Sequence, residues 1–175
     1  MTALSIRPAT PADIPAITRI YGASVLNGTA SFELEPPDEA EMARRMNELI
    51  GNGFPYLAAD ADGELIGYAY AALYRTRPAY RWTVEDSVYI APDRQRGGLG
   101  RSLLTALITA CSERGFRQMI AVIGDSPRQA GSVALHKALG FEHVGILQDV
   151  GFKHGHWCDS LLMQRALGDG AAKAP

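Results

Sequence analysis

A glycine-rich loop between a predicted strand and an amphipathic helix is the feature that most constrains this chain. The strand is predicted over residues 82–90, and the loop is Gln95-Arg96-Gly97-Gly98-Leu99-Gly100. An apolar stripe at helical spacing follows, at Leu103, Leu104, Leu107, Ile108 and Cys111. The first N–H groups of a helix have no intrahelical partner and bind anions. The loop therefore predicts an anion site, although glycine turns also precede helices that bind no ligand.

The segment after this helix completes a βαβ unit. Residues 119–123 are uniformly apolar, which is typical of a short strand buried on both faces. A further helix is predicted over residues 132–139, where Gly140 ends it. Residues 141–150 and 158–165 then predict a closing hairpin whose turn contains His154-Gly155.

The segments before the loop predict a strand, two helices and a hairpin. The strand covers residues 4–7, and Thr10-Pro11-Ala12-Asp13 carries the signals of a helix start. Pro36-Pro37-Asp38 opens a second helix, whose apolar positions are Met42, Met46, Leu49 and Ile50. Asp62-Gly63 is a preferred dipeptide of tight hairpin turns and joins strands at residues 54–59 and 65–73. The fold class is therefore α/β (α+β), with helices on both faces of a mixed sheet.

The length and composition predict one globular domain. The chain has 175 residues, of which 47% are hydrophobic and 21% are charged. We expect this domain to cover residues 1–167 and the small-residue-rich tail, 168–175, to be disordered.

The net charge and the cysteine content indicate which binding partners and which cellular compartment to expect. The net charge of −2 gives no long-range attraction to nucleic acid or an anionic membrane. Two cysteines without paired spacing predict no disulfide framework, and neither a signal sequence nor a long apolar run is evident. We expect a cytoplasmic protein without nucleic-acid or membrane partners.

Three nucleotide-binding interpretations of the loop differ in spacing. A P-loop requires Gly-Lys-Ser/Thr, which this loop lacks. A dinucleotide fingerprint requires a third glycine where this chain has Leu103, although Asp125 imitates its ribose-binding acid.

The remaining pattern, Gln95-x-x-Gly98-x-Gly100, resembles the acetyl-coenzyme A motif of the GNAT superfamily. Residues 82–85, 136–140 and 151–155 resemble its phosphinothricin N-acetyltransferase branch, which includes methionine sulfoximine and methionine sulfone acetyltransferases. The resemblance covers residues 6–167 and implies a largely antiparallel sheet that is splayed at the cofactor site. It also implies a homodimer.

The resemblance assigns the cofactor-binding residues. It implies that backbone groups of Val88, Tyr89 and Ile90 bind the pantetheine arm and that the loop through Arg101 binds the pyrophosphate. Arg94, Arg96 and Arg101 offer positive charge there. The family usually has asparagine where this chain has Gln129, which keeps the amide but lengthens its reach. The predicted set is Val88, Tyr89, Ile90, Gln95, Arg96, Gly97, Gly98, Leu99, Gly100, Arg101 and Gln129.

Glu85 and His136 are the predicted catalytic residues. Glu85 lies in the strand beside the loop and is the candidate base, whereas Asp86 points to the opposite face. His136 stands where many superfamily members have a tyrosine that acts as the general acid. The roles of acid, base and orienting group are all open for this histidine. The alternatives are a strand carboxylate paired with arginine or backbone groups and a histidine hydrogen-bonded at the sheet surface.

The acceptor pocket is predicted from the segment before the catalytic strand. Arg75, Arg77 and Tyr80 lie there, and arginine forks suit carboxylate and phosphinate oxygens. The alternative is a solvated loop. By resemblance these residues and Glu85 bind an amino-acid-like acceptor.

The sequence favours direct transfer without a metal. His154, His156 and Cys158 alternate, but three ligands interrupted by Gly155 make a poor metal site. Cys111 lies in the buried helical stripe and is expected to be inert, so acetyl passes within a ternary complex. The open alternatives are a non-catalytic acyl-coenzyme A-binding module and an acetyltransferase for polyamines or protein termini, whose pocket would be acidic.

Overall fold

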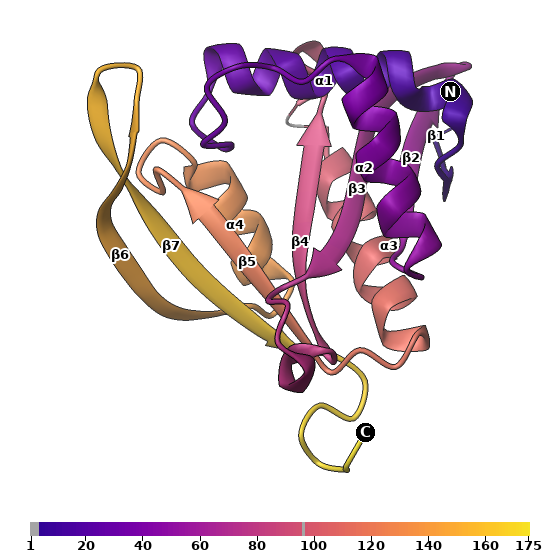
Figure 1. The fold of residues 1–175 in the computed structure, drawn as a ribbon, viewed down its shortest axis with the longest axis vertical. Coiled ribbons are helices and arrows are strands. Elements are labelled where there is room, and N and C mark those ends of the chain that lie inside the picture. The colour runs from indigo at the N-terminus through magenta and orange to yellow at the C-terminus, as the bar shows by residue number, and fades with distance from the viewer. Residues whose placement is uncertain (1–3, 96) are drawn as a thin grey trace.

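A single twisted sheet organises the chain in the computed structural model, which describes residues 4–95 and 97–175 (Figure 1). Its order is β1-β2-β3-β4-β5-β7-β6. The strands are β1 (Leu4–Pro8), β2 (Tyr56–Ala61), β3 (Glu64–Leu73), β4 (Thr83–Ile90), β5 (Gln118–Gly124), β6 (Glu142–Lys153) and β7 (His156–Ala166). The helices are α1 (Ile14–Asn27), α2 (Glu39–Gly51), α3 (Leu99–Glu113) and α4 (Ala130–Ala138). The predicted fold class is confirmed.

Local turn chemistry sets the two predicted hairpins. Asp62 and Gly63 have φ of 53° and 83°, so both adopt the left-handed conformation of a tight turn between β2 and β3. His154 and Gly155, with φ of 50° and 79°, do the same between β6 and β7. Both predicted turns are therefore confirmed.

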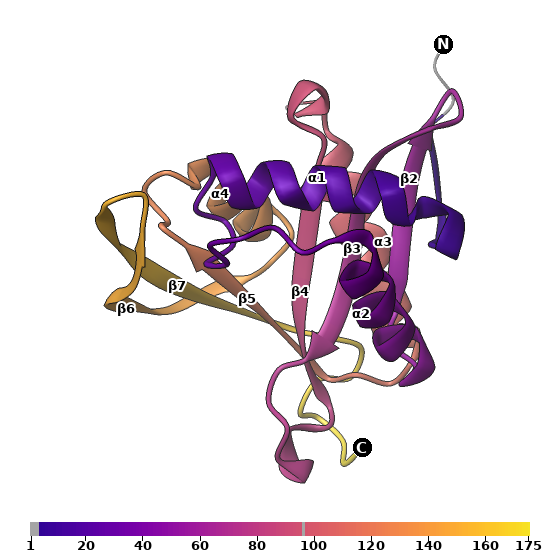
Figure 2. The same cartoon turned by 45° about the horizontal axis from the view of Figure 1, so that its top comes forward.

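The helices cover the two faces of the sheet. Figure 2 shows α1 and α2 on one side of the central strands, with α3 and α4 behind. The α3 stripe is buried as predicted, since Leu103, Leu104, Leu107 and Cys111 expose 0%. Each large apolar side chain buried in this way contributes about 1.5–3 kcal/mol. Ile50, one of the apolar positions expected at helical spacing in the second helix, lies at the edge of the α2 stripe and is 43% exposed.

The sheet is splayed between β4 and β5. These parallel strands pair only from Thr83–Gln118 to Glu85–Ile120, and Figure 1 shows them diverging beyond that point. All other strand pairs are antiparallel. The expectation that β5 is buried on both faces is wrong, because Val122 is 37% exposed. It lies beyond the last pair with β4, where the opening leaves one face of β5 uncovered.

The end of the chain is simple. Leu167 is 1% exposed directly after β7, and residues 168–175 continue in turns such as Gly170 N–H to Leu167 O, 2.8 Å. Among the described residues, none of the helices combines the length and apolar character needed to cross a membrane.

Candidate active site

The divergence of β4 and β5 opens a cleft of about 760 Å³. Side chains and backbone from β4, β5, the α3 start, α4 and the segment after α1 line it. Eight of the predicted cofactor residues are among the lining: Val88, Tyr89, Ile90, Gln95, Gly98, Gly100, Arg101 and Gln129. Glu85 and His136 line the same cleft, so the structure brings the two predicted catalytic residues together with Gln95, Gly98 and Gly100 of the loop.

The start of α3 has the geometry of an anion cradle. Gly98 precedes the helix with φ of 81°, a left-handed conformation that favours glycine. The N–H groups of Arg101 and Ser102 donate to Gly98 O at 3.0 and 3.2 Å. The amides of Gly98, Leu99 and Gly100 precede those bonds and remain for a ligand.

The loop glycines have different roles. A Cβ on Gly100 would lie 3.1 Å from Ile90 and 3.2 Å from Leu135, so this glycine lets α3 pack against β4 and α4. The Leu99 side chain is only 5% exposed and belongs to the core, so only its backbone is available to a ligand. Gly97 is not part of the cleft lining, and Arg96 lies outside the described residues.

The charges beside the cradle are unequal. Arg101 lines the cleft, whereas Arg94 pairs with Glu64 at 3.2 Å and with Asp93 at 3.4 Å. In these ion pairs the Arg94 guanidinium contacts carboxylates, whereas the sequence analysis expected it to offer charge to the phosphates. Arg101 is therefore the cation that the described part of the loop presents to the cleft.

The inner edge of β4 is open to an extended ligand. In the described ranges, 4–95 and 97–175, no strand pairs with residues 86–90 on the β5 side. Val88, Tyr89 and Ile90 line the cleft along this stretch. Unpaired strand groups of this kind hydrogen-bond an extended chain laid beside them.

Glu85 has the environment of a general base. It lies at the last β4–β5 pair, beside Ile120, and it lines the cleft. Burial, followed by the negative charge of Asp86, raises the pKa of the Glu85 carboxyl to about 7. A carboxylate with a pKa near neutrality is suited to accept a proton from a bound ammonium group.

Asp86, which the sequence analysis did not assign to the site, forms a buried hydrogen bond with His136. It points to the opposite face from Glu85, as expected, and its Oδ2 lies 2.9 Å from Nε2 of His136. The two side chains are 2% and 5% exposed. No local signal relates these positions, because the partners are 50 residues apart in the chain.

His136 faces hydrogen-bond acceptors at both ring nitrogens. Nδ1 lies 2.8 Å from the carbonyl oxygen of Ser132, and Nε2 lies against Asp86. These partners assign a proton to each nitrogen. Burial lowers the pKa of His136, but the hydrogen bond and charge of Asp86 and the Ser132 carbonyl raise it to a net value above 6.5. With an acceptor at each ring nitrogen, the surroundings favour the imidazolium form and disfavour a proton-accepting role for His136.

Of the predicted acceptor residues, Glu85 lines the main cleft, whereas Arg75, Arg77 and Tyr80 do not. Tyr80 lines a second cavity of about 260 Å³, with Tyr74, Thr83 and Ile120 among its other walls. The Arg75 guanidinium lies 5.1 Å from the ring centre of Tyr74 and 6.0 Å from that of Tyr80. Arg75 and Arg77 are exposed on the loop before β4 and contribute to neither cavity wall. Ile120 connects the two regions, because it is the strand partner of Glu85.

The alternating residues His154, His156 and Cys158 near the β6–β7 turn do not form one cluster. His154 Nε2 lies 3.3 Å from Gly28 O, whereas Asp125 joins His156 and Cys158 within 4.8 Å. A guanidinium nitrogen of Arg128 contacts His156 Nε2 and lies 3.0 Å from Asp125. Burial alone would raise the pKa of the Asp125 carboxyl. The hydrogen bonds from Arg128 and His156 outweigh burial, so the pKa lies below its usual value. Arg128 supplies the positive charge in this cluster.

Neither cysteine is a nucleophile for the cleft. Cys111 and Cys158 are both free and buried, and neither lines the cavity. Burial raises the pKa of the Cys111 thiol to about 12 and also raises that of Cys158. Thiols with raised pKa values contain little of the nucleophilic thiolate.

Comparisons with known proteins match the whole fold. A sequence model of the acetyltransferase (GNAT) domain matches residues 6–162. A phosphinothricin N-acetyltransferase from Alcaligenes faecalis is 51% identical over 99% of this chain and 87% of its own. An L-methionine sulfoximine/L-methionine sulfone acetyltransferase from Pseudomonas aeruginosa is 41% identical over 98% of both chains. The crystal structure of a GNAT phosphinothricin acetyltransferase from Sinorhizobium meliloti with acetyl-coenzyme A has a TM-score of 0.95 and 51% identity, over 98% of this chain and 92% of its own.

Proposed function

The chain belongs to the GNAT family of acetyltransferases, and from this premise we propose that it transfers acetyl from acetyl-coenzyme A to the amino group of a small amino-acid-like acceptor. The observation that supports this most is the cleft that joins Glu85 to the α3 cradle. The acceptor class is that of phosphinothricin, methionine sulfoximine and methionine sulfone, which the similar enzymes are named for.

The cleft fits acetyl-coenzyme A. The open edge of β4 at Val88, Tyr89 and Ile90 suits the extended pantetheine arm, and the α3 amides with Arg101 suit the pyrophosphate. Gln95 and Gln129 line the cleft near that end and offer amide groups. The bound thioester supplies an activated acetyl group.

Residues of the chain carry out the proton transfer and the charge stabilisation that the reaction requires. The C–N bond of the product amide forms as the C–S bond breaks, and the products are an acetylated amine and a free thiol. The acceptor ammonium loses two protons: Glu85 accepts the first, and the second passes from the nitrogen to the departing thiolate to give the thiol. An N–H of β4 stabilises the negative charge that develops on the carbonyl oxygen. The imidazolium of His136 favours the departing thiolate electrostatically.

The loop before β4 would recognise the polar end of the acceptor. Arg75 is close to Tyr80, whose cavity adjoins Glu85 through Ile120. Arg75 and Arg77 offer guanidinium forks for a carboxylate or a second oxyanion. Both cysteines are buried away from the cleft, which supports direct transfer in a ternary complex over an acyl-enzyme.

An acceptor screen tests the function. We expect thiol release from acetyl-coenzyme A with phosphinothricin, methionine sulfoximine or methionine sulfone, and a kcat/KM at least about tenfold lower with spermidine or an alanyl peptide, because the loop is basic. Mass spectrometry of the product identifies the acetylated amine.

The controls for the screen distinguish the alternatives. Tight acetyl-coenzyme A binding without turnover on any amine would indicate the non-catalytic module. Preferred acetylation of spermidine or of the peptide would refute the proposed acceptor class. Acetylated protein that accumulates in the absence of acceptor would refute direct transfer.

We also propose a homodimer formed through the β6–β7 hairpin. The hairpin exposes large apolar side chains at Val144, Ile146, Leu147, Val150, Phe152 and Trp157. Trp157 is 62% exposed and packs edge-on against Phe152 at 5.2 Å. An apolar surface of this extent favours a protein interface.

Trp157→Arg is expected to shift the native mass from dimer to monomer in light-scattering chromatography, because it places a charge in the apolar patch. Ile50→Arg is the matched control, since Ile50 is an exposed apolar residue on α2. A wild-type monomer, or an unchanged dimer in Trp157→Arg, would contradict this interface.

The cellular setting that fits these features is the cytoplasm. The net charge of −2 supports a small-molecule acceptor over nucleic acid or a membrane, and both cysteines are free. Residues 1–167 would act as one acetyltransferase domain, and residues 168–175 would be a tail outside it.

A further inference from the structure

Asp125, His156 and Cys158 bring three kinds of metal ligand together beside the cleft. Within residues 4–95 and 97–175, theirs is the one group of three such side chains whose ligand atoms all lie within 4.8 Å of one another. Asp125 follows the end of β5, and the other two residues lie at the start of β7. None of the three lines the main cleft, so the acetyl-transfer site leaves this group without a role.

The separations in the group match those of a tetrahedral zinc site. Asp125 Oδ2 lies 3.2 Å from His156 Nε2, and Cys158 Sγ lies 3.5 Å from the same nitrogen. At zinc bond lengths, tetrahedral ligands lie about 3.3 Å apart for nitrogen and oxygen and about 3.5 Å apart for nitrogen and sulfur. Zn²⁺ accepts carboxylate, imidazole and thiolate ligands. The His156 side chain is 31% exposed, so water reaches the fourth position.

A backbone contact of His156 determines which ring nitrogen is available to an ion. Nδ1 lies 3.4 Å from the carbonyl oxygen of His154. Because a carbonyl only accepts hydrogen bonds, this contact assigns the proton of the neutral ring to Nδ1 and leaves the lone pair on Nε2. Histidines that bind metals usually donate from their other ring nitrogen to a carbonyl or a carboxylate in this way.

Arg128 supplies the cation of the group. One of its guanidinium nitrogens contacts His156 Nε2 and lies 3.0 Å from Asp125 Oδ2. The single lone pair of Nε2 cannot accept hydrogen bonds from both Arg128 and the Cys158 thiol. The Arg128 side chain is 60% exposed, so it can move into water at little cost. A divalent cation that took its place would contact all three ligand atoms.

The backbone at Asp125 is held in an uncommon conformation. Its φ is 51°, in the left-handed region that residues other than glycine rarely adopt. Its N–H donates to the carbonyl oxygen of Asp159 on β7 at 2.7 Å. A Cβ on Gly124 would lie 2.7 Å from the carbonyl oxygen of Thr29, so the segment after α1 packs closely against this turn. Protein contacts alone therefore hold Asp125 beside β7.

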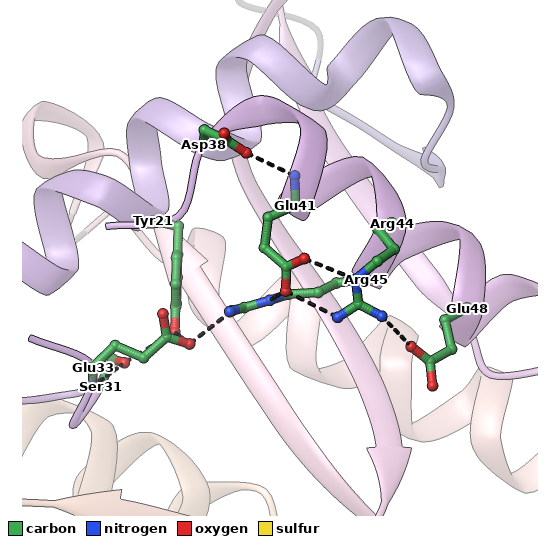
Figure 3. A network of polar contacts seen from close by, with 8 residues as sticks. All are labelled: Tyr21, Ser31, Glu33, Asp38, Glu41, Arg44, Arg45 and Glu48. Carbon is green, nitrogen blue, oxygen red and sulfur yellow. Dashed lines mark hydrogen bonds and ion pairs between the residues drawn. The ribbon is translucent and has the colours of Figure 1, made fainter. Parts of the chain in front are cut away.

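A polar network holds the segment after α1. The Tyr21 hydroxyl lies 2.9 Å from Ser31 Oγ and donates to Glu33 at 3.0 Å, and Arg45 of α2 pairs with Glu33 at 2.7 Å (Figure 3). Lys153, the last residue of β6, donates from Nζ to the carbonyl oxygen of Ser31 at 2.6 Å. The wall beside the group is thus fixed from α1, α2 and β6. Ligands held in place by their surroundings bind more tightly, because less freedom is lost on binding.

We propose that Asp125, His156 and Cys158 bind a Zn²⁺ ion that ties the end of β5 to the start of β7. The ion replaces the Arg128 guanidinium, and water is the fourth ligand. The Sγ–H bond of Cys158 breaks as the Sγ–Zn bond forms, and the proton passes to solvent. The charge stays balanced, because Zn²⁺ with one carboxylate and one thiolate is neutral, as is Arg128 with the carboxylate. The inference goes beyond the proposed function.

Metal titrations of the full chain test the site. After treatment with EDTA and dialysis, the wild type is expected to bind one Co²⁺ with a thiolate-to-cobalt charge-transfer band, and Zn²⁺ should displace the Co²⁺. At a Zn²⁺ concentration of about 100 times its dissociation constant, the Tm should rise by about 5–10 °C. Absorption spectroscopy, calorimetric titration and thermal unfolding measure these effects.

Replacing a ligand should abolish tight binding. His156→Gln and Cys158→Ser are each expected to weaken Zn²⁺ binding by more than about 100-fold, since even a residue that only hydrogen-bonds a ligand contributes about 10- to 100-fold. Cys111 remains in Cys158→Ser, so loss of the band there assigns the thiolate to Cys158. His154→Asn is the matched control and should bind Zn²⁺ like the wild type, because asparagine tolerates the φ of 50° at this position.

Arg128→Gln should have the opposite effect. Removing the competing cation is expected to raise the affinity for Zn²⁺ by up to about fivefold, the usual contribution of an exposed ion pair. Zn²⁺ that bound elsewhere on the surface would not respond in this way. A lower affinity in this variant would contradict the exchange of Arg128 for the ion.

The remaining outcomes decide the assignment of the site. The inference is wrong if Co²⁺ gives the wild type no thiolate band, or if His156→Gln binds Zn²⁺ as tightly as the wild type. Equal losses in His154→Asn and His156→Gln would refute this choice of ligands. Should Cys158→Ser fail to fold, the variants of the more exposed His156 and Arg128 still decide the question. The titrations contain no acetyl-coenzyme A or acceptor, so their failure leaves the proposed function standing, and the reverse also holds.

Discussion

Replacing Glu85 with glutamine is expected to lower kcat for methionine sulfone by about 10²- to 10⁴-fold, the usual contribution of a general base. Glutamine keeps the size of the side chain and its ability to form hydrogen bonds, but its amide accepts no proton. Because the cradle at α3 is untouched, the dissociation constant of acetyl-coenzyme A should change by less than about threefold, which separates catalysis from binding. Steady-state kinetics and calorimetric titration measure the two quantities.

The pH profile of the same variant identifies the titrating group. The base acts when it is deprotonated, and the pKa of Glu85 is raised to about 7, so wild-type kcat/KM should fall as the pH drops through about 7. The residual rate of Glu85→Gln should lack this inflection. Glu142→Gln, a carboxylate exposed at the start of β6, is the control and should match the wild type. Wild-type kcat in Glu85→Gln would rule out Glu85 as the base.

Features that depend on local chemistry could be predicted from the sequence. Asp62-Gly63 forms its turn because two adjacent residues adopt positive φ, and Gly98 marks the helix start for the same reason. The α3 stripe is predictable because a helical period of apolar residues needs one covered face. These signals lie within a few residues and do not require the rest of the fold.

Features that depend on the divergence of β4 and β5 were harder to predict from the sequence. The apolar residues of β5 predicted burial on both faces, but the opening between the strands exposes Val122 to the cleft. Hydrophobicity alone does not distinguish a wall of a binding cleft from a core strand. The predicted acceptor loop met the same limit, since Arg75 and Arg77 lie outside the main cleft and their part in binding stays a prediction.

Contacts between side chains that are distant in the sequence could not be predicted, because no local pattern marks them. The Glu85 and Asp86 neighbours face opposite sides of β4, so only the tertiary fold shows that Asp86 meets His136. The Phe32 ring likewise packs against two glycines that are distant from it in the sequence, Gly124 at the end of β5 and Gly151 near the end of β6. In both cases the residue types are ordinary, and their meaning comes from packing across the sheet.

Replacing Asp86 with asparagine is expected to lower the free energy of unfolding by about 2–3 kcal/mol at pH 6, because a hydrogen bond to a charged group is lost in a buried site. For a chain of this length, that loss corresponds to a Tm decrease of about 4–12 °C. The carboxylate is 2% exposed, so water does not replace the missing partner. Differential scanning calorimetry of both proteins measures the change.

The pH dependence of that decrease tests whether His136 is an imidazolium. Its pKa is raised above 6.5 in the folded state, so the stability from the pair is fully present below the unfolded value of 6.5 and is lost as the pH rises through the folded pKa. The Tm difference between wild type and Asp86→Asn should therefore shrink as the pH rises from 6 toward 9. Asp93→Asn, an exposed carboxylate with 75% side-chain exposure, should show little difference at any pH. A Tm difference that stays constant across this range would mean that His136 is neutral, and the imidazolium would then be wrong as the group that stabilises the departing thiolate.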